Sequence, residues 1–218
     1  MIEKTASEIL KRVKRLQNGD VSRTMQRLGI NYGTNYGVSI PQLRQISLEY
    51  KADSELADKL LNSEIREAKI IASMLFNISD IDATQLLSIS NKADNIEMVE
   101  QFSKNLFAQA KVLESVLPIL IENNYWQKVL ALYSASWYLK SNKSPNFSII
   151  EWSKVQINNQ INEDDKLTQK ATVFLLQSLS SVNNDYMQEM VSLAEKMLNS
   201  EKDSVRGLAQ EFLWLNVS

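Results

Sequence analysis

The chain has 218 residues, of which 44% are hydrophobic and 23% are charged, so the composition predicts an ordered globular protein. The absence of cysteine and histidine excludes disulfides, thiol nucleophiles, a Ser-His-Asp triad and zinc sites built on those side chains. The formal net charge of −2 gives little general attraction to phosphate, although residues 1–50 carry eight basic and four acidic side chains. Any chemistry has to come from carboxylates, lysines, tyrosines and hydroxyl groups, and we expect no metal and no cofactor.

The first residues lack the apolar stretch of a signal peptide. The apolar run from Val112 to Ile121 is too short to cross a bilayer and contains Glu114. We therefore expect a cytoplasmic monomer that makes no membrane contact.

The distribution of glycine predicts an all-α protein. Four of the five glycines lie in the first 37 residues, and the fifth is Gly207. A sheet protein of this length would need glycine at many turns, whereas a helical array can turn with Asn, Asp and Ser. Clusters of those three residue types occur at the corners 77–80, 142–145 and 180–185.

The first elements in chain order are three helices and a loop. Glu3 to Gln17 has an amphipathic pattern, and its basic face would suit phosphate or an acidic membrane, although a solvated face is the simpler interpretation. Asp20 is expected to cap a short helix that ends at Leu28. Residues 29–38 form a glycine-rich loop without the Gly-Lys-Ser/Thr of a phosphate-binding loop. Ser39 to Gln42 then predicts a helix start with a capping box.

Short helices follow in quick succession to the end of the chain, with short corners that favour antiparallel helical hairpins stacked on one another. The expected ranges are 53–61, 63–77, 82–89, 94–107, 110–123, 124–141, 146–157, 163–181, 184–199 and 203–216.

The helix at 94–107 has two distinct faces. Met98, Val99, Phe102 and Leu106 fall on one side at helical spacing. Asp94, with Glu97 three residues later, is expected to cap its start. The opposite side consists of Ile96, Glu97, Glu100, Gln101 and Lys104. This side is either a solvated surface, where a Glu100–Lys104 pair would contribute about 0.2–0.5 kcal/mol, or the floor of a site.

A basic residue recurs near the start of four helices. These residues are Lys69, Lys128, Lys170 and Arg206, which lie 59, 42 and 36 residues apart. Two of these spacings are near the period of two-helix repeats, and the spacing of 59 is one longer step. Each charge alone is most simply a surface residue, but the recurrence favours an inner, basic wall. We therefore predict a single domain over 1–218, with the right-handed α-α superhelix of HEAT-like (ARM-type) helical repeats.

Several segments resemble the DNA alkylation repair enzyme family of AlkD-like glycosylases. Residues 37–46 resemble its G-x-x-x-P-x-L-R segment, and residues 65–72 resemble its next helix. Gln101 and residues 105–107 resemble the tail of its signature helix. Residues 125–128 and 168–171 resemble its later repeats, so the resemblance covers about residues 20–180.

The resemblance implies a solenoid that binds double-stranded DNA on a concave basic face. It also implies excision of cationic alkylated purines such as N3-methyladenine and N7-methylguanine. Because a cationic base is already a good leaving group, the protein mainly has to stabilise the developing sugar cation with a carboxylate. Aromatic faces would pack against the sugar and the base.

The family's functional positions are matched here by related but different residues. Ile96 stands where the family has a signature Trp, and Glu97 stands where it has its first signature Asp. Glu100 matches the catalytic Asp with one more methylene, and a displacement of about 1 Å can cost roughly 100-fold in rate. Phe174 matches the second Trp of the site, and Lys128 matches a DNA-contacting Arg.

Three hypotheses follow. The first is a glycosylase of altered scope in which Glu100 is the catalytic carboxylate. The second is a non-catalytic relative that binds duplex DNA, including branched or distorted forms. The third is a scaffold that binds a protein partner. The residues expected to contact DNA are Ile96, Glu97, Lys104, Lys128, Lys170, Phe174, Lys69 and Arg206. Salt-sensitive duplex binding separates the third hypothesis from the others.

Overall fold

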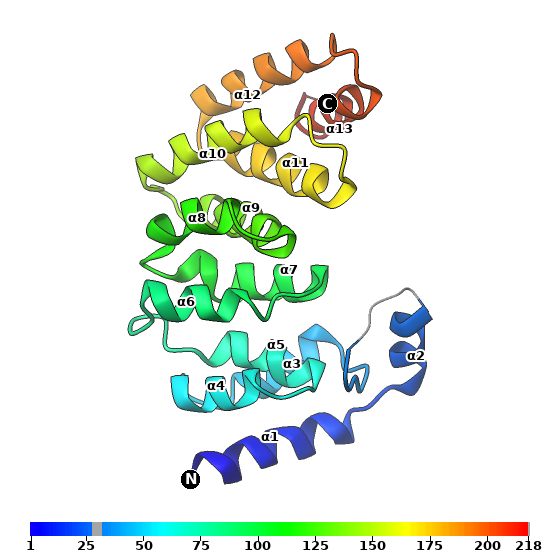
Figure 1. Cartoon of the computed structure of the whole chain (residues 1–218), viewed down its shortest axis with the longest axis vertical. Helices are drawn as coiled ribbons and strands as arrows, with labels where there is room; N and C mark the ends of the chain where they lie inside the picture. Colours follow the sequence, from blue (N-terminus) through cyan, green and yellow to red (C-terminus); the bar gives the residue numbers. More distant parts are fainter. Residues whose placement is uncertain (28–31, 218) are drawn as a thin grey trace. The chain divides into compact units, whose positions relative to one another are not determined.

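The computed structural model describes residues 1–27 and 32–217, and within this part of the chain it contains thirteen α-helices and one short 3-10 helix (Figure 1). No β-strand occurs among these residues, which confirms the predicted all-α class. Contacts divide the chain into two compact units, Met1–Leu106 and Phe107–Ser218. Whether they behave as one domain stays a prediction. No helix in the described ranges is long and apolar enough to span a membrane.

In the first unit, α5 is the central helix. It packs against α3, α4 and α7, and its buried residues include Ala68, Ile70, Ile71 and Leu75. Because α5 is covered on several sides, the charged residues at its start are also buried, and this positions the site described below. The helices of this unit are α1 (Ile2–Arg15), α2 (Gly19–Arg27), α3 (Ile40–Ser47), α4 (Ser54–Leu61), α5 (Arg66–Leu75), α6 (Ala83–Ser90) and α7 (Ile96–Asn105).

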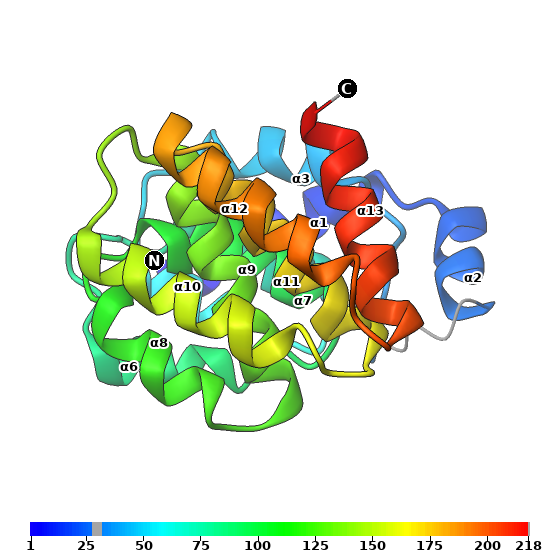
Figure 2. The same ribbon diagram turned by 90° about the horizontal axis from the view of Figure 1, so that it is seen from above.

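In the second unit, the packing of α9 against α11 is the most extensive, and α13 also packs against α11. The two main helices bury small polar residues whose hydroxyls bond to the carbonyl one turn earlier, as Ser134 does to Leu130 and Thr172 does to Thr168. Figure 2 shows these helices from above. The elements are η1 (Phe107–Gln109), α8 (Leu113–Ile121), α9 (Tyr125–Ser141), α10 (Phe147–Gln160), α11 (Lys166–Ser180), α12 (Asn184–Met197) and α13 (Asp203–Val217).

The predicted helices are all present with bounds shifted by up to three residues, but two predicted caps are wrong. The side chain of Asn18, not Asp20, accepts the backbone N–H groups at the start of α2, and Asp20 pairs with Arg23 instead. Asn95, not Asp94, caps α7 by accepting the N–H of Met98 at 3.1 Å. The capping box of Ser39 is confirmed. Leu28 and part of the predicted glycine-rich loop, residues 28–31, lie outside the described residues.

Candidate nucleic-acid interface

Helix α7 has the two faces that the sequence predicts. Met98, Val99 and Phe102 are fully buried. Glu100 is exposed on the other side, and Glu97 is partly exposed at the first turn. The structure therefore presents two carboxylates on one side of one helix, three residues apart.

The carboxylate of Glu97 is held by Arg66 of α5. Nε of Arg66 lies 2.7 Å from Oε2 of Glu97, and Nη2 lies 2.5 Å from Oε1, which is the bidentate arrangement that suits a guanidinium and a carboxylate. The Tyr32 hydroxyl also donates to Glu97. Only 4% of the Arg66 side chain and 16% of the Glu97 side chain are exposed, so this ion pair is largely shielded from water.

The same guanidinium fixes the loop that precedes α3. Nη1 of Arg66 donates to the carbonyl of Val38 and to Glu67, at 2.9 Å in both cases. Glu67 is completely buried and accepts the backbone N–H groups of Tyr36 and Val38, both at 3.2 Å. Residues 32–38 are thereby bonded to the start of α5. Gly37 adopts φ +71°, a conformation that side-chain-bearing residues rarely adopt.

Burial, together with the contacts to Glu97, shifts the pKa of two of these groups. Burial raises the pKa of Tyr32, and its bond to Glu97 raises it further, so this hydroxyl remains a donor. Burial tends to lower the pKa of Arg66, but the bonds and charge of Glu97 outweigh it and raise the pKa overall. The network is therefore built from a permanent cation and a permanent hydroxyl donor around the carboxylate of Glu97.

Glu100 is in a different situation from Glu97. Its carboxylate has no hydrogen bond or ion pair among residues 1–27 and 32–217. Partial loss of hydration raises its pKa, and the charge of Glu97 adds to the effect. Chemically, Glu100 offers an accessible carboxylate whose charged form is destabilised by its surroundings, which is a feature of functional carboxyl groups as well as of crowded surface acids.

The remaining predicted residues of the first unit lie on the same two helices. Ile96 is partly exposed at the start of α7, and Lys104 is exposed near its end. Lys69 is partly exposed on α5, one turn after Arg66. These positions are compatible with DNA contact, which stays a prediction for each of them and for Glu97.

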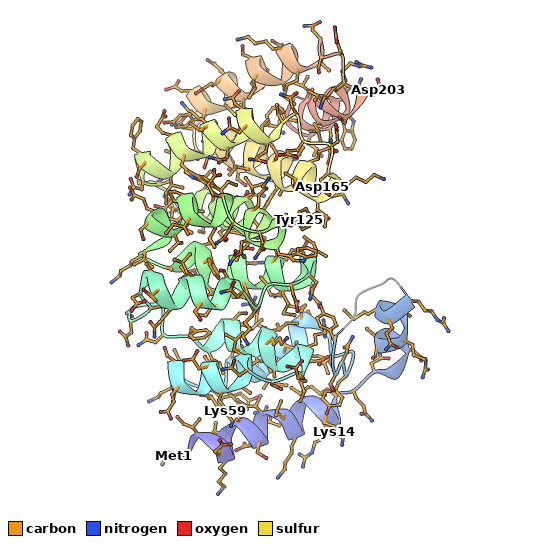
Figure 3. The ribbon with its side chains drawn as sticks, viewed as in Figure 1. Met1, Lys14, Lys59, Tyr125, Asp165 and Asp203 are labelled. Atoms are coloured by element: carbon orange, nitrogen blue, oxygen red, sulfur yellow. The ribbon has the colours of Figure 1, made fainter. Side chains whose placement is uncertain are left out.

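In the second unit, the predicted basic residues occupy nearly the same place in alternate helices, α9, α11 and α13. Lys128 is the fourth residue of α9, Lys170 is the fifth of α11 and Arg206 is the fourth of α13. Figure 3 labels Tyr125, which begins α9, and Asp203, which begins α13; both lie on the same side of this unit. The first turns of these helices therefore share one side.

The three cations have different partners. Nζ of Lys128 lies 3.6 Å from a carboxylate oxygen of Glu163. Arg206 pairs with Asp203 and donates to the carbonyls of Ser200 at 2.6 Å and Glu201 at 2.9 Å, so it closes the loop before its own helix. Lys170 is exposed and makes no hydrogen bond or ion pair within the described part of the chain. Lys170 is accordingly the most available of the three for a phosphate.

The acidic segment 162–165, just before α11, connects these helix starts. The Tyr125 hydroxyl donates to Asp165 at 2.8 Å, and Nζ of Lys202 lies 2.8 Å from the carbonyl of Asn162 and 3.4 Å from Asp164. Burial, followed by the bond to Asp165, raises the pKa of Tyr125 to about 12. Together with the Lys128–Glu163 pair, these contacts place three acids among the basic side chains.

Phe174 belongs to an aromatic cluster between α9 and α11. Its ring centroid lies 5.5 Å from that of Tyr133 and 5.4 Å from that of Trp137, and Nζ of Lys140 lies 5.0 Å from the Phe174 ring centroid. Phe174 is partly exposed, one turn after Lys170. The cluster presents aromatic edges and a cation on the helices that carry Lys128 and Lys170.

Sequence reasoning missed Tyr32, Arg66, Glu67 and the acidic segment 162–165. A local signal was the adjacent pair Arg66–Glu67 at the start of a helix whose remaining residues are mostly apolar, and the structure buries both side chains.

Comparisons with known proteins place the chain in a family. The family model described as "DNA alkylation repair enzyme" matches residues 9–203. A solved structure described as "A new family of proteins related to the HEAT-like repeat DNA glycosylases with affinity for branched DNA structures" superposes with a TM-score of 0.79, at 12% identity over 96% of this chain and 94% of that chain. This likeness confirms the HEAT-like fold. The curated proteins contain no match. The chain belongs to the DNA alkylation repair enzyme family.

Proposed function

We propose that this protein binds double-stranded DNA in a repair context, with Lys170 and Lys128 of the second unit on the phosphate backbone. The observation that carries the proposal is the recurrence of a cation at the fourth or fifth residue of α9, α11 and α13. Backbone N–H groups at a helix start attract anions, and a lysine within the first five residues adds a full positive charge nearby.

The basic residues differ in how directly they contact phosphate in this proposal. Lys170 is exposed without a partner in the described ranges and is the primary phosphate contact. Lys128 binds a phosphate in place of Glu163. Its 3.6 Å ion pair with Glu163 is partly exposed to solvent and therefore weak. Arg206 contributes mainly through its charge because its guanidinium is bound to its own loop. Lys69 and Lys104 supply further contacts from the first unit.

The preferred substrate of this proposal is duplex DNA that is branched or distorted. The similar solved structure is described as having affinity for branched DNA structures, and we extend that preference to this chain. The aromatic cluster of Tyr133, Trp137 and Phe174 supports it, because bases that are no longer stacked in a duplex can stack on aromatic rings.

A salt titration tests the binding proposal. Affinity for a labelled blunt duplex and for a four-way junction is measured by fluorescence anisotropy at several salt concentrations. Each phosphate contact contributes about −0.9 to the slope of log K against log salt, so Lys170→Glu reduces the slope by about 1 and weakens binding. Lys196→Glu on α12 is the matched control and leaves both quantities unchanged. Salt-independent binding, or no binding, would refute the proposal.

Excision of a cationic alkylated purine is a second candidate function, and the accessible carboxylate of Glu100 favours it. Two features work against it. Ile96 offers no aromatic face to the base or sugar, and the carboxylate of Glu97 is already bound by Arg66. Release of methylated purines from methylated duplex DNA is compared between the wild type, Glu100→Gln and the control Glu55→Gln on α4. Release that is lost only in Glu100→Gln supports catalysis, and no release by the wild type excludes it.

A further inference from the structure

A groove of about 330 Å³ runs along one side of α1 in the first unit. Glu3, Ser7, Leu10 and Lys14 line it from α1, and their spacing of three or four residues places them in one stripe of the helix. The opposite wall is formed by side chains from three other segments, namely Tyr36, Lys59 and Ile65. The proposed functions above use none of these residues.

Both ends of α1 are tied to the rest of the unit, so the groove is a fixed feature. Glu3 pairs with Lys59 of α4 at 2.7 Å. Toward the other end, Nη1 of Arg12 lies 2.8 Å from Oε2 of Glu49, and the guanidinium also bonds to the hydroxyl of Tyr50. Between these ties, the apolar side of α1 is buried in the unit through Ala6, Ile9 and Val13.

The groove combines an apolar floor with a positive rim. Leu10, Tyr36 and Ile65 are partly exposed and supply the floor. Lys11 and Lys14 are exposed and make no ion pair or hydrogen bond in the part of the chain that the structure describes. With Lys59 and Glu3 included, three cations and one anion line the groove, a net charge of +2. A complementary ligand therefore has a flat apolar part beside negative charges. Figure 3 labels Lys14 and Lys59.

We propose that this groove binds an unpaired segment of a DNA strand, with a base against Tyr36 and Leu10 and the adjoining phosphates on Lys11 and Lys14. Aromatic side chains that stack bases, next to cations that follow the backbone, are the usual means of binding single strands. The volume is at the lower end of the range for small-ligand sites, roughly 300–1,000 Å³, which suits a nucleotide unit and not a double helix.

Two other anionic partners fit the groove less well. An acidic peptide would pair with the lysines but would leave the apolar floor without a matching surface. An anionic membrane would need apolar side chains that project outward, whereas Leu10 and Ile65 are partly covered within the groove. The proposal rests on the proposed function in one respect, because branched DNA is the source of the unpaired strand.

The test measures binding of a fluorescent oligothymidylate to the full chain by anisotropy at several salt concentrations. Lys11→Glu/Lys14→Glu is expected to weaken binding at least tenfold. It is also expected to reduce the salt slope by about 1.4, since each phosphate on a single strand contributes about 0.7. The matched control is Lys4→Glu/Arg15→Glu, which makes the same charge change on the same helix outside the groove and is expected to change the affinity less than twofold. Tyr36→Leu should weaken binding several-fold without changing the slope.

The outcomes separate this proposal from the duplex proposal. Blunt-duplex affinity that is unchanged in Lys11→Glu/Lys14→Glu but reduced in Lys170→Glu supports two separate sites. If the wild type binds the oligothymidylate but no duplex, the duplex proposal fails and the groove proposal stands. Equal weakening in both double variants, or no binding of the oligothymidylate by the wild type, overturns the groove proposal. Competition experiments give a further test. If polyglutamate or vesicles with phosphatidylserine displace the labelled oligothymidylate as well as unlabelled oligothymidylate does, the groove proposal is also overturned. Circular dichroism confirms that each variant is folded.

Discussion

Replacing Arg66 with methionine is the sharpest test of the network in the first unit. Arg66 is 3% exposed and makes two bonds to Glu97, one to Glu67 and one to the carbonyl of Val38. Methionine replaces the unbranched stem of arginine but not its guanidinium, so Arg66→Met leaves two carboxylates in low-dielectric surroundings without their cation. Breaking a buried ion pair in this way costs about 3–5 kcal/mol, which is a large part of a typical stability of about 5–15 kcal/mol.

Urea unfolding measures this loss, and two probes report different parts of the chain. Circular dichroism follows helices in both units, whereas tryptophan fluorescence follows the second unit alone, since Trp126, Trp137, Trp152 and Trp214 all lie there. If the chain is one domain over 1–218, both probes shift equally in Arg66→Met. If the units unfold separately, only the dichroism transition shifts.

A surface ion pair provides the control for this experiment. Arg12 pairs with Glu49, but their side chains are 29% and 58% exposed, so Arg12→Met should cost much less stability than Arg66→Met. The double variant Arg66→Met/Glu97→Gln should be more stable than Arg66→Met alone, because it removes one of the uncompensated charges. An Arg66→Met variant as stable as Arg12→Met would refute the assignment of Arg66 as the centre of the network.

Three further predictions address the loop, the acidic segment and Glu100. Gly37→Ala should destabilise the protein by about 1–3 kcal/mol in urea unfolding, because its φ of +71° disfavours any side chain. Glu163→Gln should tighten duplex binding in the anisotropy assay, because it frees Lys128 from its 3.6 Å partner, and an unchanged affinity would contradict this role. The raised pKa of Glu100 means that the folded state holds this proton more tightly than the unfolded state, so ionisation costs stability as pH rises above the unfolded value of about 4.3. Glu100→Gln should therefore be more stable than the wild type at pH 7, by less than about 1 kcal/mol because the residue is exposed, and the gain should disappear in unfolding measurements near pH 3.

The helices were predictable because their signals are local. The apolar spacing of Met98, Val99 and Phe102 correctly identified the buried face of α7. The error of one residue at its cap has a simple cause. Asp94 and Asn95 are both good capping residues, and the apolar pattern does not fix which of two adjacent residues takes the non-helical conformation.

The partners of Glu97 were not predictable by the same means. Tyr32 and Glu97 are separated by 65 positions, and Arg66 and Glu97 by 31. Spacing along one helix predicts only side-chain neighbours that are three or four residues apart. For Glu97 it predicted a position on the polar side of its helix but no partner on another helix. The distant partners of Glu97 depend on which helices pack together. A single sequence has no local pattern that predicts this packing.

The candidate carboxylate Glu100 and the two main proposed phosphate contacts, Lys128 and Lys170, lie in different units, and this bears on how the protein relates to its family. Glu100 and Ile96 are in the first unit, where Ile96 offers an aliphatic and not an aromatic side chain and the neighbouring carboxylate of Glu97 is bound to Arg66. Lys128 and Lys170 are in the second unit and are positively charged. Loss of an aromatic face mainly affects stabilisation of a reacting base, whereas attraction to phosphate needs only cations. Affinity for DNA can therefore persist where excision is reduced, and for this reason we rank DNA binding above catalysis.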